Sequence, residues 1–65
     1  MEIILNGESH ATAENSVLGL LRSLEIDPRR VAVELNLDIL PKAEYETTLL
    51  NLGDKIEIVH FVGGG

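Results

Sequence analysis

The sequence contains no cysteine and no tryptophan, and it has only one tyrosine and one phenylalanine. Without cysteine there is neither a disulfide framework nor a thiol nucleophile, which is compatible with a reducing compartment. No apolar run approaches the roughly 20 residues that cross a bilayer. Ile3-Ile4-Leu5, preceded by the acidic Glu2, is too short for the apolar region of a signal peptide. We therefore expect a cytoplasmic protein with no membrane partner.

Basic residues are also scarce. Five lysines and arginines stand against eleven aspartates and glutamates, and the formal net charge is −6. Binding to a phosphate backbone needs clustered positive charge, so nucleic acid is excluded as a partner. His10 and His60 have no cysteine or Glu-x-x-His spacing near them that would complete a metal site. We expect no metal and no bound cofactor.

What the chain does contain is aliphatic side chains. Of its 65 residues, 45 % are hydrophobic, mostly Leu, Ile and Val. This is enough for one small core near the lower size limit of independent folding. We expect a single domain over residues 1–65, with residues 63–65 as a flexible tail.

The first half of the chain predicts a hairpin. Residues 2–6 form the first strand candidate, and residues 8–13 the second, which is polar enough to be an edge strand. Between them stands Asn6-Gly7, the dipeptide most typical of a type I′ turn, in which both central residues have φ > 0.

A helix of about ten residues follows the hairpin, because apolar residues recur there at helical spacing. Asn15 or Ser16 is expected to cap its start, and Asp27-Pro28 to end it. Gly19 indicates close packing of the helix against the sheet. The apolar stripe consists of Val17, Leu20, Leu21 and Leu24.

The second half predicts mainly strands. Residues 31–36 alternate clearly, residues 47–50 form a weak short strand, and residues 56–62 form the last strand. Tyr45, in a single helical turn, is expected to pack at the edge of the core. Asp54 follows Gly53 in a turn and is expected to be a hydrogen-bond acceptor there, not a catalytic acid.

This order predicts an α+β fold of the β-grasp, or ubiquitin-like, type. It would have a mixed sheet of four to five strands with one main helix packed on one face. The first and last strands would lie side by side and parallel, with the last strand central because it is strongly apolar.

The last strand runs directly into Gly63-Gly64-Gly65. Glycines have no Cβ, so this segment could pass through a narrow channel to present its terminal carboxylate. If Ile56 and Ile58 face the helix, then Val59 and Phe61 face outward together with Ile4 of the neighbouring strand. These three side chains would form an apolar patch for a partner at the root of the tail.

These residues resemble a known family. Leu52-Gly53-Asp54-Lys55-Ile56-Glu57-Ile58-Val59-His60-Phe61-Val62-Gly63-Gly64-Gly65 is similar to the C-terminal signature of the ThiS family, the small sulfur carriers of bacterial thiamine biosynthesis. Ile4-Leu5-Asn6-Gly7-Glu8 and Val31-Ala32-Val33-Glu34-Leu35-Asn36 also match. The resemblance covers essentially the whole chain and implies a β-grasp fold. Many members have glycine where this chain has Leu37, a departure that speaks against a tight I′ turn at that point.

The resemblance implies a carrier and not an enzyme. A ThiF-like adenylyltransferase would use Mg-ATP to adenylate Gly65, and a sulfur donor such as a cysteine desulfurase would supply the sulfur. The resulting thiocarboxylate would be delivered to a ThiG-like thiazole synthase. Gly63 and Gly64 would thread the partner's channel, and Phe61, Val59 and Ile4 would contact the partner.

Three other interpretations stay open at this stage. One is the small subunit of molybdopterin synthase, which also ends in Gly-Gly. Another is a ubiquitin-like modifier that becomes attached to lysines. The third is a β-grasp binding module whose tail is inert.

Overall fold

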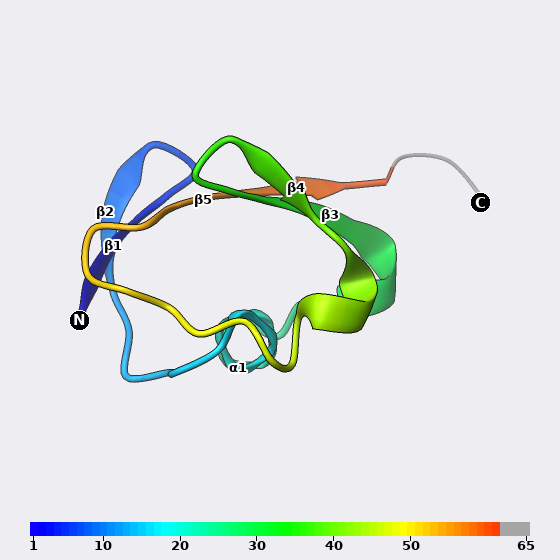
Figure 1. The fold of residues 1–65 in the computed structure, drawn as a ribbon, viewed down its shortest axis with the longest axis horizontal. Coiled ribbons are helices and arrows are strands. Elements are labelled where there is room, and N and C mark those ends of the chain that lie inside the picture. Colours follow the sequence, from blue (N-terminus) through cyan, green and yellow to red (C-terminus); the bar gives the residue numbers. More distant parts are fainter. Residues whose placement is uncertain (62–65) are drawn as a thin grey trace.

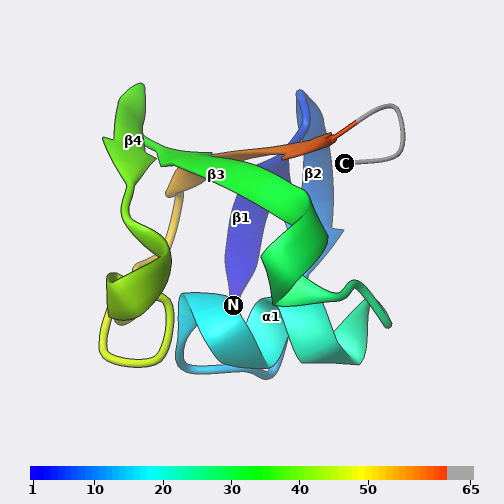
Figure 2. The same cartoon turned by 90° about the vertical axis from the view of Figure 1, so that its right-hand side faces the viewer.

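The computed structural model describes residues 1–61 and contains one five-stranded sheet and one α-helix. Figure 1 shows the sheet arching over the helix, and Figure 2 shows that the helix lies on one face only. Two 3₁₀ turns, η1 and η2, connect the elements. In chain order the elements are β1 (Glu2–Leu5), β2 (Glu8–Ala11), α1 (Val17–Ser23), η1 (Pro28–Arg30), β3 (Val31–Leu35), β4 (Asp38–Leu40), η2 (Lys42–Glu44) and β5 (Lys55–His60).

The strand order is β2-β1-β5-β3-β4, so β5 is the central strand and β2 an edge strand. β1 and β5 pair in parallel, whereas the remaining pairs are antiparallel. This confirms the predicted mixed β-grasp sheet. Asn6 and Gly7 have φ of 48° and 83°, as the predicted I′ turn requires. The predicted strand over residues 47–50 is wrong, because that segment makes only one isolated bridge, between Ser16 and Leu49.

The helix begins as predicted but ends earlier. Ser16 is the N-cap, and its hydroxyl accepts a hydrogen bond from the Gly19 N–H. At the other end Glu25 adopts φ 60°, and the N–H of Ile26 donates to the carbonyl of Leu21, the bond that defines a Schellman ending. Asp27-Pro28 therefore does not end the helix, which stops at Ser23; Asp27 caps η1 instead.

Gly19 does not pack against the sheet, contrary to the sequence-based expectation. A Cβ at this position would lie 2.7 Å from Glu14 Oε1 and 3.2 Å from Ser16 Oγ. The absence of a side chain at Gly19 thus leaves room for the capping segment that precedes the helix.

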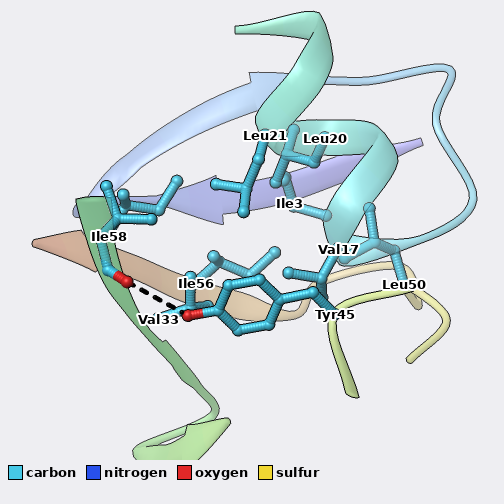
Figure 3. Close-up of a cluster of buried hydrophobic side chains, with 10 residues drawn as sticks. Ile3, Val17, Leu20, Leu21, Val33, Tyr45, Leu50, Ile56 and Ile58 are labelled. Carbon is cyan, nitrogen blue, oxygen red and sulfur yellow. Dashed lines mark hydrogen bonds between the residues drawn. The ribbon is translucent and has the colours of Figure 1, made fainter. Parts of the chain in front are cut away.

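The core fills the space between the sheet and α1 (Figure 3). Tyr45 belongs to this core and not to its edge, since it is only 3 % exposed. Its hydroxyl donates to the carbonyl of Val31 (dashed line in Figure 3), and burial raises the pKa of its phenol. The buried hydrophobic residues are Ile3, Val17, Leu20, Leu21, Val31, Val33, Tyr45, Leu50, Ile56 and Ile58.

The turn between β3 and β4 is a tight two-residue turn despite its leucine. Leu35 pairs with Asp38, which leaves only Asn36 and Leu37 in the loop, with φ of 52° and 74°. The expectation that Leu37 speaks against an I′ turn is therefore wrong. The twist of the flanking strands imposes the turn, and the leucine carries the strain of a left-handed backbone.

Leu37→Gly is expected to stabilise the protein by about 0.5–1 kcal/mol. The substitution relieves roughly 1–2 kcal/mol of left-handed strain in the folded state. It also increases the conformational entropy of the unfolded chain, which offsets about 0.4–1 kcal/mol of that gain. Chemical denaturation would measure the gain. Leu37→Ala is the matched control, because it removes the same exposed side chain, 83 % accessible, but keeps the Cβ. An equal gain in both variants would contradict the role of φ.

Candidate functional site

The site predicted from the sequence lies at the end of β5. The strand is held through its last described residue, because the Phe61 N–H donates to the Arg30 carbonyl over 3.0 Å. Ile56 and Ile58 are buried, while Val59 and Phe61 are 55 % and 57 % exposed. Gly63, Gly64 and Gly65, like Val62, lie outside the described residues, so their predicted roles and the flexible tail stay predictions.

The structure does not bring Ile4 to Val59. Ile4 is half-buried and pairs with Lys55, whereas Val59 lies four residues further along β5 and pairs with Ala32. At about 3.3 Å per residue, the two positions are roughly 13 Å apart. The exposed apolar surface at this end of β5 therefore consists of Val59 and Phe61 without Ile4.

Lys42 joins this surface, a contact that sequence reasoning missed. Its Nζ lies 4.7 Å from the centroid of the Phe61 ring, a cation–π distance. The same ammonium donates to the carbonyls of Arg29 and Val31 over 3.1 and 3.0 Å. Lys42 thus ties η1 and the start of β3 to the root of the C-terminal segment. Nothing in the local sequence signals a contact between residues so far apart in the chain.

Positive charge gathers at the same end of this acidic protein. Arg22, Arg29 and Lys42 line one shallow depression, which also includes Glu46. Arg29 makes a two-point ion pair with Asp27, and its hydrogen bonds lower the pKa of that carboxyl from 3.8 to about 2. A partner would therefore meet apolar and basic groups where β5 ends.

The structure shows the role of Asp54, for which the sequence predicted no catalytic function. Asp54 is buried in the turn before β5, where its carboxylate accepts from the Asn51 N–H and from Asn36 Nδ2 over 2.8 and 3.0 Å. Its predicted role as a turn acceptor is confirmed. Residues 1–61 contain no group of three or more His, Cys, Asp or Glu placed to hold a metal ion. Within the same residues, no helix is long and apolar enough to cross a membrane.

A single helix on one face of a mixed sheet, whose central strand leads to the C-terminal segment, defines a small ubiquitin-like protein of the β-grasp class. Residues 3–65 match the model of the ThiS family. The chain belongs to the ThiS family, which confirms the resemblance identified from the sequence.

Individual relatives agree with this assignment. The chain is 44 % identical over 50 residues to the sulfur carrier protein ThiS of Bacillus subtilis, covering 77 % of this chain and 76 % of that protein. It is similar to the crystal structure of the thiamine biosynthesis protein ThiS from Geobacter metallireducens, with a TM-score of 0.85, 30 % identity and full coverage of both chains. It is also 48 % identical to a thiazole synthase of Paramagnetospirillum magneticum, over the whole of this chain. The chain spans about a fifth of the length of that relative.

Proposed function

We propose that this protein is a sulfur carrier in the synthesis of the thiazole moiety of thiamine, with Gly65 as the residue that carries the sulfur. The observation that carries this proposal is the match to the ThiS family, which runs through the terminal glycines to residue 65. The position of β5 supports it, because this central strand leads to the C-terminal segment and pairs with β3 as far as His60.

The chemistry follows from the terminal carboxylate. A carboxylate is a poor electrophile, since its charge repels nucleophiles and it offers no good leaving group. An adenylyltransferase would join Gly65 to the AMP portion of Mg-ATP and release pyrophosphate. A persulfide sulfur would then displace AMP, and reductive cleavage of its S–S bond by a thiol would leave a thiocarboxylate. The carrier supplies no acid or base; its binding energy positions the reacting atom.

The partners are proposed from the same relationship. A ThiF-like enzyme would adenylate Gly65, a sulfur donor such as a cysteine desulfurase would provide the persulfide, and a ThiG-like thiazole synthase would consume the thiocarboxylate. The similarity of this chain to part of a thiazole synthase supports the last partnership, because domains joined in one protein commonly act together.

The experiment that tests the proposal is thiol alkylation read by intact mass. The chain is incubated with Mg-ATP, a ThiF-like enzyme and a sulfur source, and then treated with iodoacetamide. Exchange of oxygen for sulfur has the same nominal mass as oxidation of Met1 to the sulfoxide. Alkylation distinguishes the two, because the chain has no cysteine to react. A single adduct on Gly65 is expected. No adduct, with an enzyme that is competent on another carrier, would overturn the proposal.

Phe61→Asp is expected to weaken binding to the activating enzyme by about tenfold or more, as for an aromatic anchor in an interface. The protein should stay folded, because the side chain is 57 % exposed and the backbone bond to Arg30 remains. Calorimetry would measure the Kd. Leu52→Asp is the control: this residue is 76 % exposed but lies before the start of β5, at its other end. Unchanged affinity in Phe61→Asp would contradict the proposed surface.

A further inference from the structure

The first strand accompanies β5 only along part of its length. The parallel pairing of β1 with β5 ends at Leu5 and Ile56. The Asn6 N–H still donates to the Ile56 carbonyl over 2.9 Å, and the backbone then turns away through Gly7, at φ 83°. β5 continues to His60. On this side, the end of β5 therefore has no neighbouring strand within residues 1–61.

The side chain of Asn6 replaces the missing strand for one further residue. Its Oδ1 accepts from the Ile58 N–H over 2.8 Å, and its Nδ2 donates to the Ile58 carbonyl over 3.3 Å. One amide thus satisfies both backbone groups that a longer β1 would have bonded. It reaches no further along the strand.

His60 is the next residue whose backbone faces this side. Phe61 donates to Arg30 of the opposite neighbour, so its N–H faces the β3 side and that of His60 the other side. Val31, which pairs with His60, has its carbonyl turned to Lys42 and Tyr45 instead. Among residues 1–61, the N–H and C=O of His60 have no backbone partner.

We propose that this open edge of β5, beginning at His60, accepts an extended segment of the enzyme that acts on the C-terminus. The added segment would lie beside β5 in the position that β1 occupies as far as Asn6. The inference rests on the proposed function and specifies how the activating enzyme binds its substrate. Strand addition to an exposed edge is a common mode of peptide recognition, in which main-chain hydrogen bonds supply affinity.

The composition of the C-terminus is the reason to expect backbone recognition. Gly63, Gly64 and Gly65 have no side chains, so a partner can hydrogen-bond only to their N–H and C=O groups. A segment hydrogen-bonded to His60 would begin such main-chain recognition at the last residue of β5. A shallow depression of about 240 Å³, lined by Asn6, Glu57, Ile58 and Val59, lies on this edge and leaves room for a side chain of that segment.

The test removes a single donor. His60→Pro deletes the outward N–H, and proline is tolerated in strands where the N–H faces away from the ladder. Ala11→Pro is the matched control. The neighbouring Thr12 donates inward to Met1, so the Ala11 N–H also faces outward, but on β2 at the far edge of the sheet. His60→Pro is expected to weaken the Kd for the ThiF-like enzyme by about fivefold to tenfold, and Ala11→Pro by less than about twofold.

A second variant tests the same hydrogen-bond donor if His60→Pro does not fold. The chain is short enough for total synthesis, so an ester can replace the amide N–H of His60 while its side chain is kept. The ester is expected to weaken binding to the same extent. In the unaltered chain, the His60 amide should exchange rapidly with solvent when free and become protected in the complex.

The outcomes separate the inference from the proposed function. Wild-type affinity in both His60 variants would overturn the inference, while a Gly65 adduct would still uphold the carrier function. Protection of the His60 amide that rises with concentration of the chain alone would assign the edge to a second copy and also overturn it. An unaltered chain that neither binds the enzyme nor forms the adduct would overturn both.

Discussion

Removal of Gly64 and Gly65 is expected to abolish formation of the alkylated thiocarboxylate while leaving the fold intact. In the proposed function the reacting atom is the carboxyl carbon of Gly65. The new terminal carboxylate on Gly63 would lie two residues, roughly 7 Å, short of the position at which the enzyme binds that carbon. The core should be unaffected, because its buried residues all lie between Ile3 and Ile58. Intact-mass measurement after iodoacetamide treatment would show a complete loss of the adduct, and circular dichroism would show unchanged unfolding.

The truncated chain supplies its own control for binding. If Val59 and Phe61 contact the enzyme, the truncated chain should still bind and should inhibit modification of the full-length chain by competition. A residual adduct on the truncated chain would contradict the assignment of Gly65. A full-length chain that binds but never forms an adduct would instead favour a β-grasp binding module with an inert tail.

Asn6→Ala is expected to lower the free energy of unfolding by about 2–3 kcal/mol. Alanine at φ 48° costs roughly 1–2 kcal/mol of left-handed strain. Loss of the two bonds to Ile58 adds about 1 kcal/mol or more, because the backbone groups of a buried residue lose their partner. For a domain of this size, the melting temperature should fall on the order of 10–20 °C.

Asn6→Gly separates the two contributions. Glycine adopts positive φ without strain but has no amide for Ile58. The loss should therefore consist of the hydrogen-bond part, about 1–2 kcal/mol, and about 0.4–1 kcal/mol of added unfolded-state entropy, without the strain. Thermal and chemical unfolding of both variants would measure the difference. Asn6→Ala within about 0.5 kcal/mol of the unaltered chain would show that water replaces the amide at no net cost.

Much of the fold could be predicted from the sequence, because it depends on signals that are local. The period-two pattern of residues 31–36, the Asn6-Gly7 turn and the cap at Ser16 each specify a conformation within a few residues. The apolar last strand indicated its central position, and the order of elements then indicated the β-grasp sheet. The terminal glycines marked the candidate site without any structure.

The errors occur where a local signal was outweighed by packing. Asp27-Pro28 can end a helix, but α1 ends before it. The Ile26 N–H donates to the Leu21 carbonyl, and Glu25 adopts φ 60°. A type I′ turn favours glycine after asparagine, yet the paired strands β3 and β4 hold Leu37 in such a turn after Asn36. In both cases a non-glycine residue has positive φ, which costs about 1–2 kcal/mol and which residue preferences therefore argue against. Packing in the tertiary structure compensates for this cost.

By itself, the sequence determined the class of fold, the strand that leads to the C-terminus and the absence of a thiol. Only the tertiary structure decided which groups surround the end of that strand. The register of β1 separates Ile4 from Val59, and Lys42 lies over Phe61 from a segment far away in the chain. The edge at His60 is open because the amide of Asn6 reaches Ile58 and no further. The physical reason is the same each time: strand register and side-chain reach are set by packing between distant segments, and a pattern within a few neighbouring residues does not encode them.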